Sequence, residues 1–186
     1  MGIPGVREGD DDGALVRRVL DGDTAAYAGL VARYRDRLGR YAMRMLGNQA
    51  DAEEALQDTF VRAYRSLARC TDGNRFGAWV FGILVNRCRT HGARRARRER
   101  TVLVDDGALA RASVRDTAEQ HAWRETIAWA LERIPPAHRE AFLLKHVEDR
   151  SYEEMVELTG ATVPALKMRV ARAREALQRL LEVQRA

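Results

Sequence analysis

The chain has few of the features that mark secreted, membrane-bound or disulfide-rich proteins. Two cysteines, Cys70 and Cys88, are too few and too far apart for a disulfide framework, and no C-x-x-C pair suggests a zinc site. No apolar run approaches the roughly 20 residues that a membrane span needs, and the opening stretch MGIPGVREGDDDG is too polar for a signal peptide. We therefore expect a cytoplasmic protein without membrane insertion, in which residues 1–13 form a disordered leader.

Groups that carry out bond chemistry are also scarce. The histidines show no metal-ligand spacing with cysteine or with paired carboxylates, and no glycine-rich phosphate loop is present. These histidines are His91, His121, His138 and His146. The sequence therefore predicts no metal, no cofactor and no catalytic residue, and it disfavours an enzyme that acts on nucleic acid.

Charge is what the chain has in excess. Its 32 Lys and Arg residues outnumber 27 Asp and Glu residues, which gives a formal net charge of +5 and indicates a polyanionic partner. Most of the chain also shows apolar residues at helical spacing, which predicts an all-α fold. We expect two small helical domains, residues 14–100 and 120–186, joined by a flexible linker over residues 101–119, where the helical pattern is lost.

The last two of four helices expected in the second domain have the pattern of a helix-turn-helix. Ser151 and Glu154 have the spacing of a capping box, Gly160 can make the turn, and Thr162 with Pro164 predicts the start of the second helix. One side of this helix is apolar and the other is cationic near its start, as a helix that enters the DNA major groove requires. A solvated amphipathic helix is the alternative.

Residues 76–100, FGAWVFGILVNRCRTHGARRARRER, form a second candidate for nucleic-acid binding. Aromatic rings can stack on unpaired bases, while a run of arginines follows the phosphate backbone. Phe76 and Trp79 could equally be core residues.

The helix expected over residues 51–67 has two apolar sides. Its inward side carries Ala52, Leu56, Phe60, Ala63 and Leu67. The opposite side places Val61 and Tyr64 among polar and acidic residues, which suggests a surface for a protein partner. Scattered exposed apolar residues are the alternative explanation.

Four stretches, in this order, carry a family resemblance: DAEEALQDTFVRAYRSL, FGAWVFGILVNRCRTHGARRARR, LERIPPAHREAFLLKHVEDRSYEEMVELTG and VPALKMRVARAREAL. They resemble the small bacterial sigma factors of the extracytoplasmic function (ECF) group, over nearly the whole chain from Ala14 onward. The resemblance implies an alternative sigma factor that binds core RNA polymerase, directs it to specific promoters and helps to open the DNA. A stand-alone helix-turn-helix transcription regulator remains the alternative.

The resemblance also implies three sets of contacts and a regulator. Contacts to core polymerase fall on Glu54, Gln57, Asp58, Val61 and Tyr64. Contacts that recognise and melt the minus-ten element, as double- and then single-stranded DNA, fall on Phe76, Trp79, Asn86, Arg87, Arg94 and Arg95. Contacts to the minus-thirty-five element fall on Lys167, Met168, Ala171 and Arg172. An anti-sigma factor is the implied regulator. Met168 departs from the family, which often has a small polar residue there, so the base sequence read at this position cannot be transferred.

Overall fold

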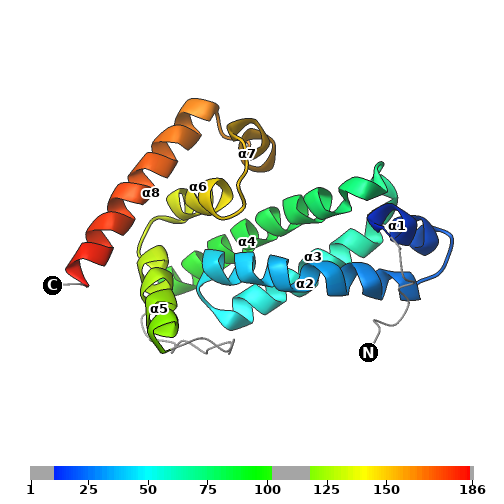
Figure 1. The fold of residues 1–186 in the computed structure, drawn as a ribbon, viewed down its shortest axis with the longest axis horizontal. Helices are drawn as coiled ribbons and strands as arrows, with labels where there is room; N and C mark the ends of the chain where they lie inside the picture. The colour runs from blue at the N-terminus through cyan, green and yellow to red at the C-terminus, as the bar shows by residue number, and fades with distance from the viewer. Residues whose placement is uncertain (1–10, 102–117, 185–186) are drawn as a thin grey trace. The chain divides into compact units, whose positions relative to one another are not determined.

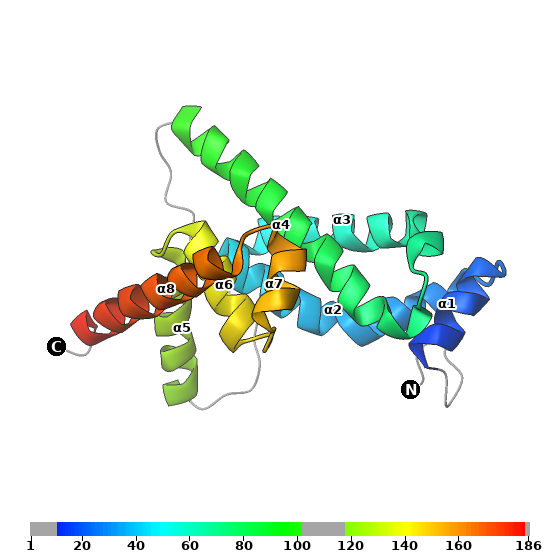
Figure 2. The same ribbon diagram turned by 90° about the horizontal axis from the view of Figure 1, so that it is seen from above.

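The computed structural model describes residues 11–101 and 118–184, and over these residues the chain is helical without any strand (Figures 1 and 2). The predicted all-α fold is therefore confirmed. The expected disordered leader and flexible linker fall mainly on residues 1–10 and 102–117, which lie outside the described residues. The described residues divide into two compact units, one of residues 11–42 and 50–101 and the other of residues 43–49 and 118–184. Residues 43–49 are thus grouped with the second unit, whereas the predicted boundaries place them in the first domain.

Four α-helices and two short 3-10 helices make up the first unit, with one exception at its boundary. They are α1 (Asp12–Leu20), α2 (Ala25–Leu46), α3 (Gln49–Arg65), η1 (Leu67–Arg69), η2 (Gly73–Arg75) and α4 (Phe76–Thr101). The exception is that the end of α2 and the first residue of α3 belong to residues 43–49 of the second unit. Helix α1 begins two residues earlier than expected because Asp11 caps it, its carboxylate accepting a hydrogen bond from the Ala14 N–H at 2.6 Å. The predicted start of α3 at Asp51 is also wrong. Asp51 lies within the first turn, where a carboxylate interacts favourably with the helix dipole.

Aromatic side chains of α2 tie this helix to α3 and α4 in the first unit. The Tyr27 hydroxyl donates a hydrogen bond to the Phe60 carbonyl of α3 at 2.6 Å. Tyr41, which is fully buried, packs edge-on against Phe81 of α4 with ring centroids 4.9 Å apart. These contacts hold α3 and α4 against a common partner, and that arrangement positions the side chains considered below.

The second unit contains four α-helices, as predicted. They are α5 (Ala118–Glu132), α6 (Pro136–His146), α7 (Tyr152–Thr159) and α8 (Val163–Val183). Helix α8 packs against the other three, and the core between them contains Leu143, Met155 and Leu166, each with no exposed surface. The turn between α5 and α6 is fixed by Arg139, which donates hydrogen bonds to the carbonyls of Glu132 at 2.7 Å and Ile134 at 3.4 Å. Within the described residues, no helix is long and apolar enough to cross a membrane.

Candidate nucleic-acid interface

Helices α7 and α8 form the helix-turn-helix that the sequence predicts. The capping box is complete: the Ser151 hydroxyl accepts from the Glu154 N–H at 3.1 Å, and the Glu154 carboxylate accepts from the Ser151 N–H at 2.8 Å. Gly160 ends α7 with a φ of 68°, a left-handed conformation that glycine adopts without strain. Thr162 then caps α8, its hydroxyl accepting from the Ala165 N–H at 3.4 Å. The glycine turn and the side-chain cap of Thr162 thus fix where α8 begins.

The capping box also stabilises a charge. The backbone N–H of Ser151, and then the Arg150 guanidinium at 2.9 Å, hold the pKa of the Glu154 carboxyl below its usual value. Glu154 therefore remains ionised near neutral pH. Its negative charge lies in the first turn of α7, where it complements the helix dipole.

Opposite sides of α8 face the core and the solvent. Leu166, Val170, Ala173 and Leu177 are buried, and the predicted apolar residues Val163 and Leu180 are half-buried. The residues expected at the minus-thirty-five element lie on the other side. Lys167, Met168, Ala171 and Arg172 are all exposed. The first three turns of α8 therefore present a surface that carries two cations and one long apolar side chain.

An aromatic ring at the start of α7 lies between two lysines. The Lys145 Nζ lies 5.3 Å from the Tyr152 ring centroid, and the Lys167 Nζ lies 5.6 Å from the same centroid. Lys145 also donates a hydrogen bond to the Arg150 carbonyl at 3.0 Å. The two distances from lysine Nζ to the ring centroid are in the range of cation–π attraction, so the ring restrains Lys167 toward the α7 side of the helix-turn-helix. The sequence reasoning missed this grouping because its members come from three different helices.

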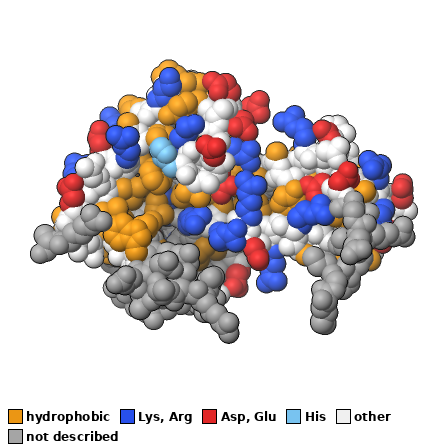
Figure 3. Space-filling view, viewed as in Figure 1, with side chains coloured by type: hydrophobic (Ala, Val, Ile, Leu, Met, Phe, Trp, Pro, Cys, Tyr) orange, Lys and Arg blue, Asp and Glu red, His pale blue; other side chains and the backbone are white. Residues whose placement is uncertain are grey.

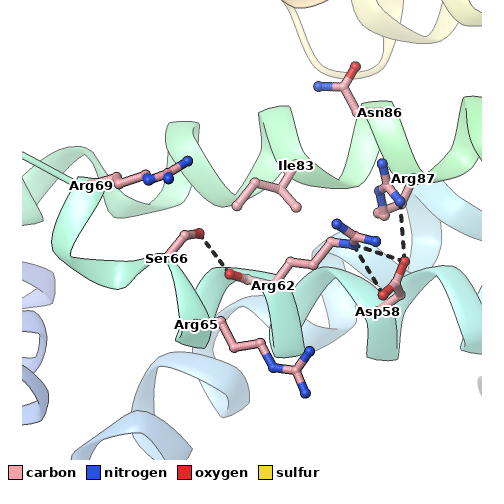
Figure 4. A pocket seen from close by; sticks show the side chains of 8 residues that line it. All are labelled: Asp58, Arg62, Arg65, Ser66, Arg69, Ile83, Asn86 and Arg87. Atoms are coloured by element: carbon pink, nitrogen blue, oxygen red, sulfur yellow. Dashed lines mark hydrogen bonds and ion pairs between the residues drawn. The ribbon is translucent and has the colours of Figure 1, made fainter.

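The first unit contains a polar pocket of about 490 Å³ between α3 and α4 (Figure 4). Two of the residues expected at the minus-ten element, Asn86 and Arg87, line it. Asp58, Arg62, Arg65, Ser66, Arg69 and Ile83 complete the lining. Figure 4 shows Ile83 near the centre, with Arg65 and Asn86 at opposite rims. Three of these arginines, at positions 62, 65 and 69, were not singled out from the sequence. Arg62 and Arg65 belong to α3 and Arg69 belongs to η1, so helical spacing alone does not group them.

Asp58 neutralises only part of the positive charge in this pocket. Its carboxylate pairs with Arg62 at 3.2 Å and with Arg87 at 3.4 Å (Figure 4). Burial acts to raise the pKa of Asp58, but the hydrogen bonds and charges of Arg62 and Arg87 outweigh it, so this pKa lies below the ordinary value of 3.8. Arg65 and Arg69 have no such partner among the described residues. The pocket therefore retains positive charge and suits a phosphate group.

Asp58 also begins a row of contacts between carboxylates of α3 and basic residues of α4. Glu54 lies 3.8 Å from the Nδ1 of His91, which is buried, and Asp51 lies 3.6 Å from Arg95. Carboxylates at positions 51, 54 and 58 thus meet basic residues at 95, 91 and 87, in the order that antiparallel helices impose. Residues that the resemblance assigns to two different partners therefore contact one another in the free protein. The exposed Arg94, in contrast, has no ion pair in the described part of the chain.

Of the two aromatic residues expected to stack on bases, only Trp79 is accessible. Phe76 has no exposed surface and packs between Tyr34, at 5.6 Å, and Trp79, at 5.9 Å between ring centroids. The assignment of Phe76 to the melted strand is therefore corrected: its ring belongs to the core. Gly77 permits this packing, because a Cβ at that position would lie 2.6 Å from the Tyr34 hydroxyl. Trp79 is half-buried and shares a side of α4 with Ile83 and Asn86.

An apolar patch lies on the exposed side of α3. Val61 is 47% exposed and Tyr64 is 44% exposed, although both are large apolar side chains. Tyr64 is held edge-on by Tyr27, with ring centroids 5.0 Å apart. Gln57 is exposed one turn before Val61. A rigid aromatic ring with a polar surround is typical of a protein–protein contact.

Charged side chains of both signs surround these surfaces. Figure 3 shows Lys and Arg spread over both units on the face drawn, with Asp and Glu among them and apolar side chains gathered over α5. No group of three or more His, Cys, Asp or Glu that could hold a metal ion occurs within residues 11–101 and 118–184. The arrangement thus offers binding surfaces, and together they define the class: an all-α, helix-turn-helix protein with a cationic pocket in a separate helical unit.

Comparison with known proteins gives the family within this class. Residues 30–98 match sigma-70 region 2, and residues 124–177 match sigma-70 region 4. The RNA polymerase sigma factor CarQ of Myxococcus xanthus is 32% identical, over 89% of this chain and 95% of CarQ. The ECF RNA polymerase sigma factor SigW of Bacillus subtilis is 29% identical, over 89% of this chain and 94% of SigW.

A solved structure of a sigma factor is also similar to this chain. The sigma factor RpoE of Bartonella quintana, in complex with the anti-sigma factor NepR, matches with a TM-score of 0.67 and 26% identity, over 83% of this chain and 96% of that chain. The chain belongs to the ECF group of RNA polymerase sigma factors.

Proposed function

We propose that this chain is an alternative sigma factor that docks on core RNA polymerase through α3, captures the minus-ten element with the pocket and α4, and reads the minus-thirty-five element with α8. Family membership supports the sigma role itself. The assignment of surfaces rests on one observation above all: a single chain presents an exposed apolar patch, a cationic pocket and a cationic recognition helix.

The polymerase contact is carried by the patch on α3. Val61 and Tyr64 supply apolar surface, and Gln57 supplies a polar edge. Glu54 and Asp58 have a second role beside the expected one, because each lies beside a basic residue of α4. They hold α3 in register with α4 and present their remaining charge to the partner.

The minus-ten contact is carried by the pocket and the adjoining side of α4. A nucleotide that leaves the DNA stack needs a surface for its base and a cation for its phosphate. Ile83 and Asn86 provide the surface for the base. Arg65 and Arg69 provide the positive charge for the phosphate. Trp79, one turn before Ile83, offers a ring for a neighbouring base, and Arg94 continues the cationic path along α4.

The protein contributes binding energy and no bond chemistry of its own. Phosphate contacts position the complex, base contacts select the promoter, and captured bases offset the cost of unpairing. We further propose that an anti-sigma factor holds the protein inactive, since RpoE was solved with such a partner. Because its partner is RNA polymerase, the protein acts in the cytoplasm.

Permanganate footprinting of a dependent promoter tests this assignment. Thymines in the melted region should become reactive only when core polymerase and this protein are both present. Trp79→Ala should preserve polymerase binding and reduce this reactivity, whereas Trp123→Ala, which alters an exposed tryptophan of the second unit, should leave it unchanged. Equal reactivity of the Trp79→Ala and wild-type complexes would overturn the stacking role.

A further inference from the structure

The recognition helix carries a long apolar side chain where polar ones are expected. Met168 is 48% exposed, although it lies in the second turn of α8 and between cationic neighbours. It contributes nothing to the core of the second unit, which Leu166 and Val170 fill from the other side of the helix. On the outward side of a recognition helix, this side chain is available to any partner that covers the first turns of α8.

The neighbours of Met168 determine the kind of partner. Lys167 is drawn toward Tyr152 of α7, with its Nζ 5.6 Å from the ring centroid, and Arg172 lies exposed one turn further along α8. Cations on both sides fit a polyanion and disfavour a purely apolar protein groove. Ala171, three residues after Met168 and also exposed, is small enough to let DNA approach closely.

The chemistry of the major groove then narrows the choice of base. Base edges in that groove present hydrogen-bond donors and acceptors, and the C5 methyl of thymine is the apolar exception. A thioether chain cannot satisfy a polar edge, but it is flexible and can pack against a methyl group. Guanine, cytosine and adenine edges facing Met168 would lose water without gaining a hydrogen bond.

We propose that Met168, supported by Ala171, selects a thymine in the minus-thirty-five element by contact with its C5 methyl group. This inference rests on the proposed function and specifies the base that α8 recognises at one position. Arg172 and Lys167 contact the neighbouring base pairs and the phosphate backbone, where their positive charges are favourable.

Removal of one methyl group at a time from the DNA tests the inference. Each thymine of the minus-thirty-five element, on both strands, is replaced in turn by deoxyuridine, which lacks only the methyl group. The binding of holoenzyme to each promoter duplex is then measured. Loss of one buried methyl contact corresponds to about a fourfold loss of affinity, so one thymine should show a loss of that size with the wild-type protein.

The protein variants identify the side chain responsible. Met168→Ala should bind the thymine and deoxyuridine duplexes equally at that position. Val183→Ala, which truncates an exposed apolar residue at the far end of the same helix, should keep the fourfold preference. The inference would be overturned if the element contained no thymine, or if no thymine showed such an effect. It would also be overturned if the preference for thymine survived in Met168→Ala. Failure of the proposed function is distinguishable from failure of this inference, because the holoenzyme would then initiate at no promoter.

Discussion

Two arginines of the pocket, Arg65 and Arg69, have no ion pair with any of the residues that the structure describes, and they give the most quantitative prediction. Arg65 and Arg69 line the space between α3 and α4, while Arg62 and Arg87 are already paired with Asp58. If the pocket holds the backbone of the melted strand, Arg65 and Arg69 should each neutralise one phosphate. The double variant Arg65→Gln, Arg69→Gln removes both charges and keeps an unbranched polar side chain at each position.

The expected size of the effect follows from counterion release. For single-stranded DNA, each phosphate contact contributes about 0.7 to the slope of log affinity against log salt, so the double variant should lower the slope by about 1.4. Between about 50 and 200 mM salt, wild-type affinity should therefore fall about sevenfold more than that of the double variant. The difference is independent of the other contacts that both proteins share.

Fluorescence anisotropy of a labelled single-stranded minus-ten oligonucleotide, bound by the reconstituted holoenzyme, measures both slopes. A control variant, Arg35→Gln with Arg40→Gln, removes two exposed arginines of α2 and should keep the wild-type slope. Lysine at positions 65 and 69 should also keep it, because the charge is retained. A double glutamine variant with the wild-type slope would refute the assignment of the pocket to phosphate binding.

Three further predictions concern the other surfaces. Tyr64→Ala should weaken assembly with core polymerase by on the order of tenfold or more, as truncation of a central interface aromatic does, and an unchanged affinity in a fluorescence titration would contradict this contact. Ser151→Ala removes an N-cap and should lower the free energy of unfolding by about 1 kcal/mol in urea titrations; no change would show that the capping box is dispensable. Because the pKa of Asp58 is lower in the folded protein than in the unfolded chain, its carboxylate stabilises the fold at higher pH, and that contribution is lost as the pH falls through the folded pKa. Asp58→Asn should therefore lose less free energy of unfolding than the wild type between about pH 5 and pH 3, and equal losses would argue against its ion pairs.

Local signals made the helix-turn-helix predictable. Ser151 with Glu154, Gly160 and Thr162 each act through hydrogen bonds or backbone conformations that involve only nearby residues, and the structure confirms them all. The exposure of Val61 and Tyr64 was predictable for the same reason, since helical spacing alone separates them from the inward side of α3.

Contacts between helices were not predictable in this way. Phe76 shares a helical side with Trp79, but its burial depends on Tyr34 of α2 and on the absence of a side chain at Gly77. The pairing of Asp58 with Arg87 likewise depends on the register of α3 against α4. Periodicity assigns a residue to one side of its own helix, and only the packing of two helices shows what that side meets.

As a sigma factor, this chain should make transcription by RNA polymerase from its promoters depend on its presence. Multi-round run-off transcription tests it most directly, with core polymerase and a pool of genomic promoter fragments, in the presence and absence of the protein. We expect specific transcripts that require the protein, with start sites that define a minus-ten and a minus-thirty-five element. Retention of duplex DNA by the protein alone, without any dependent transcript, would contradict it.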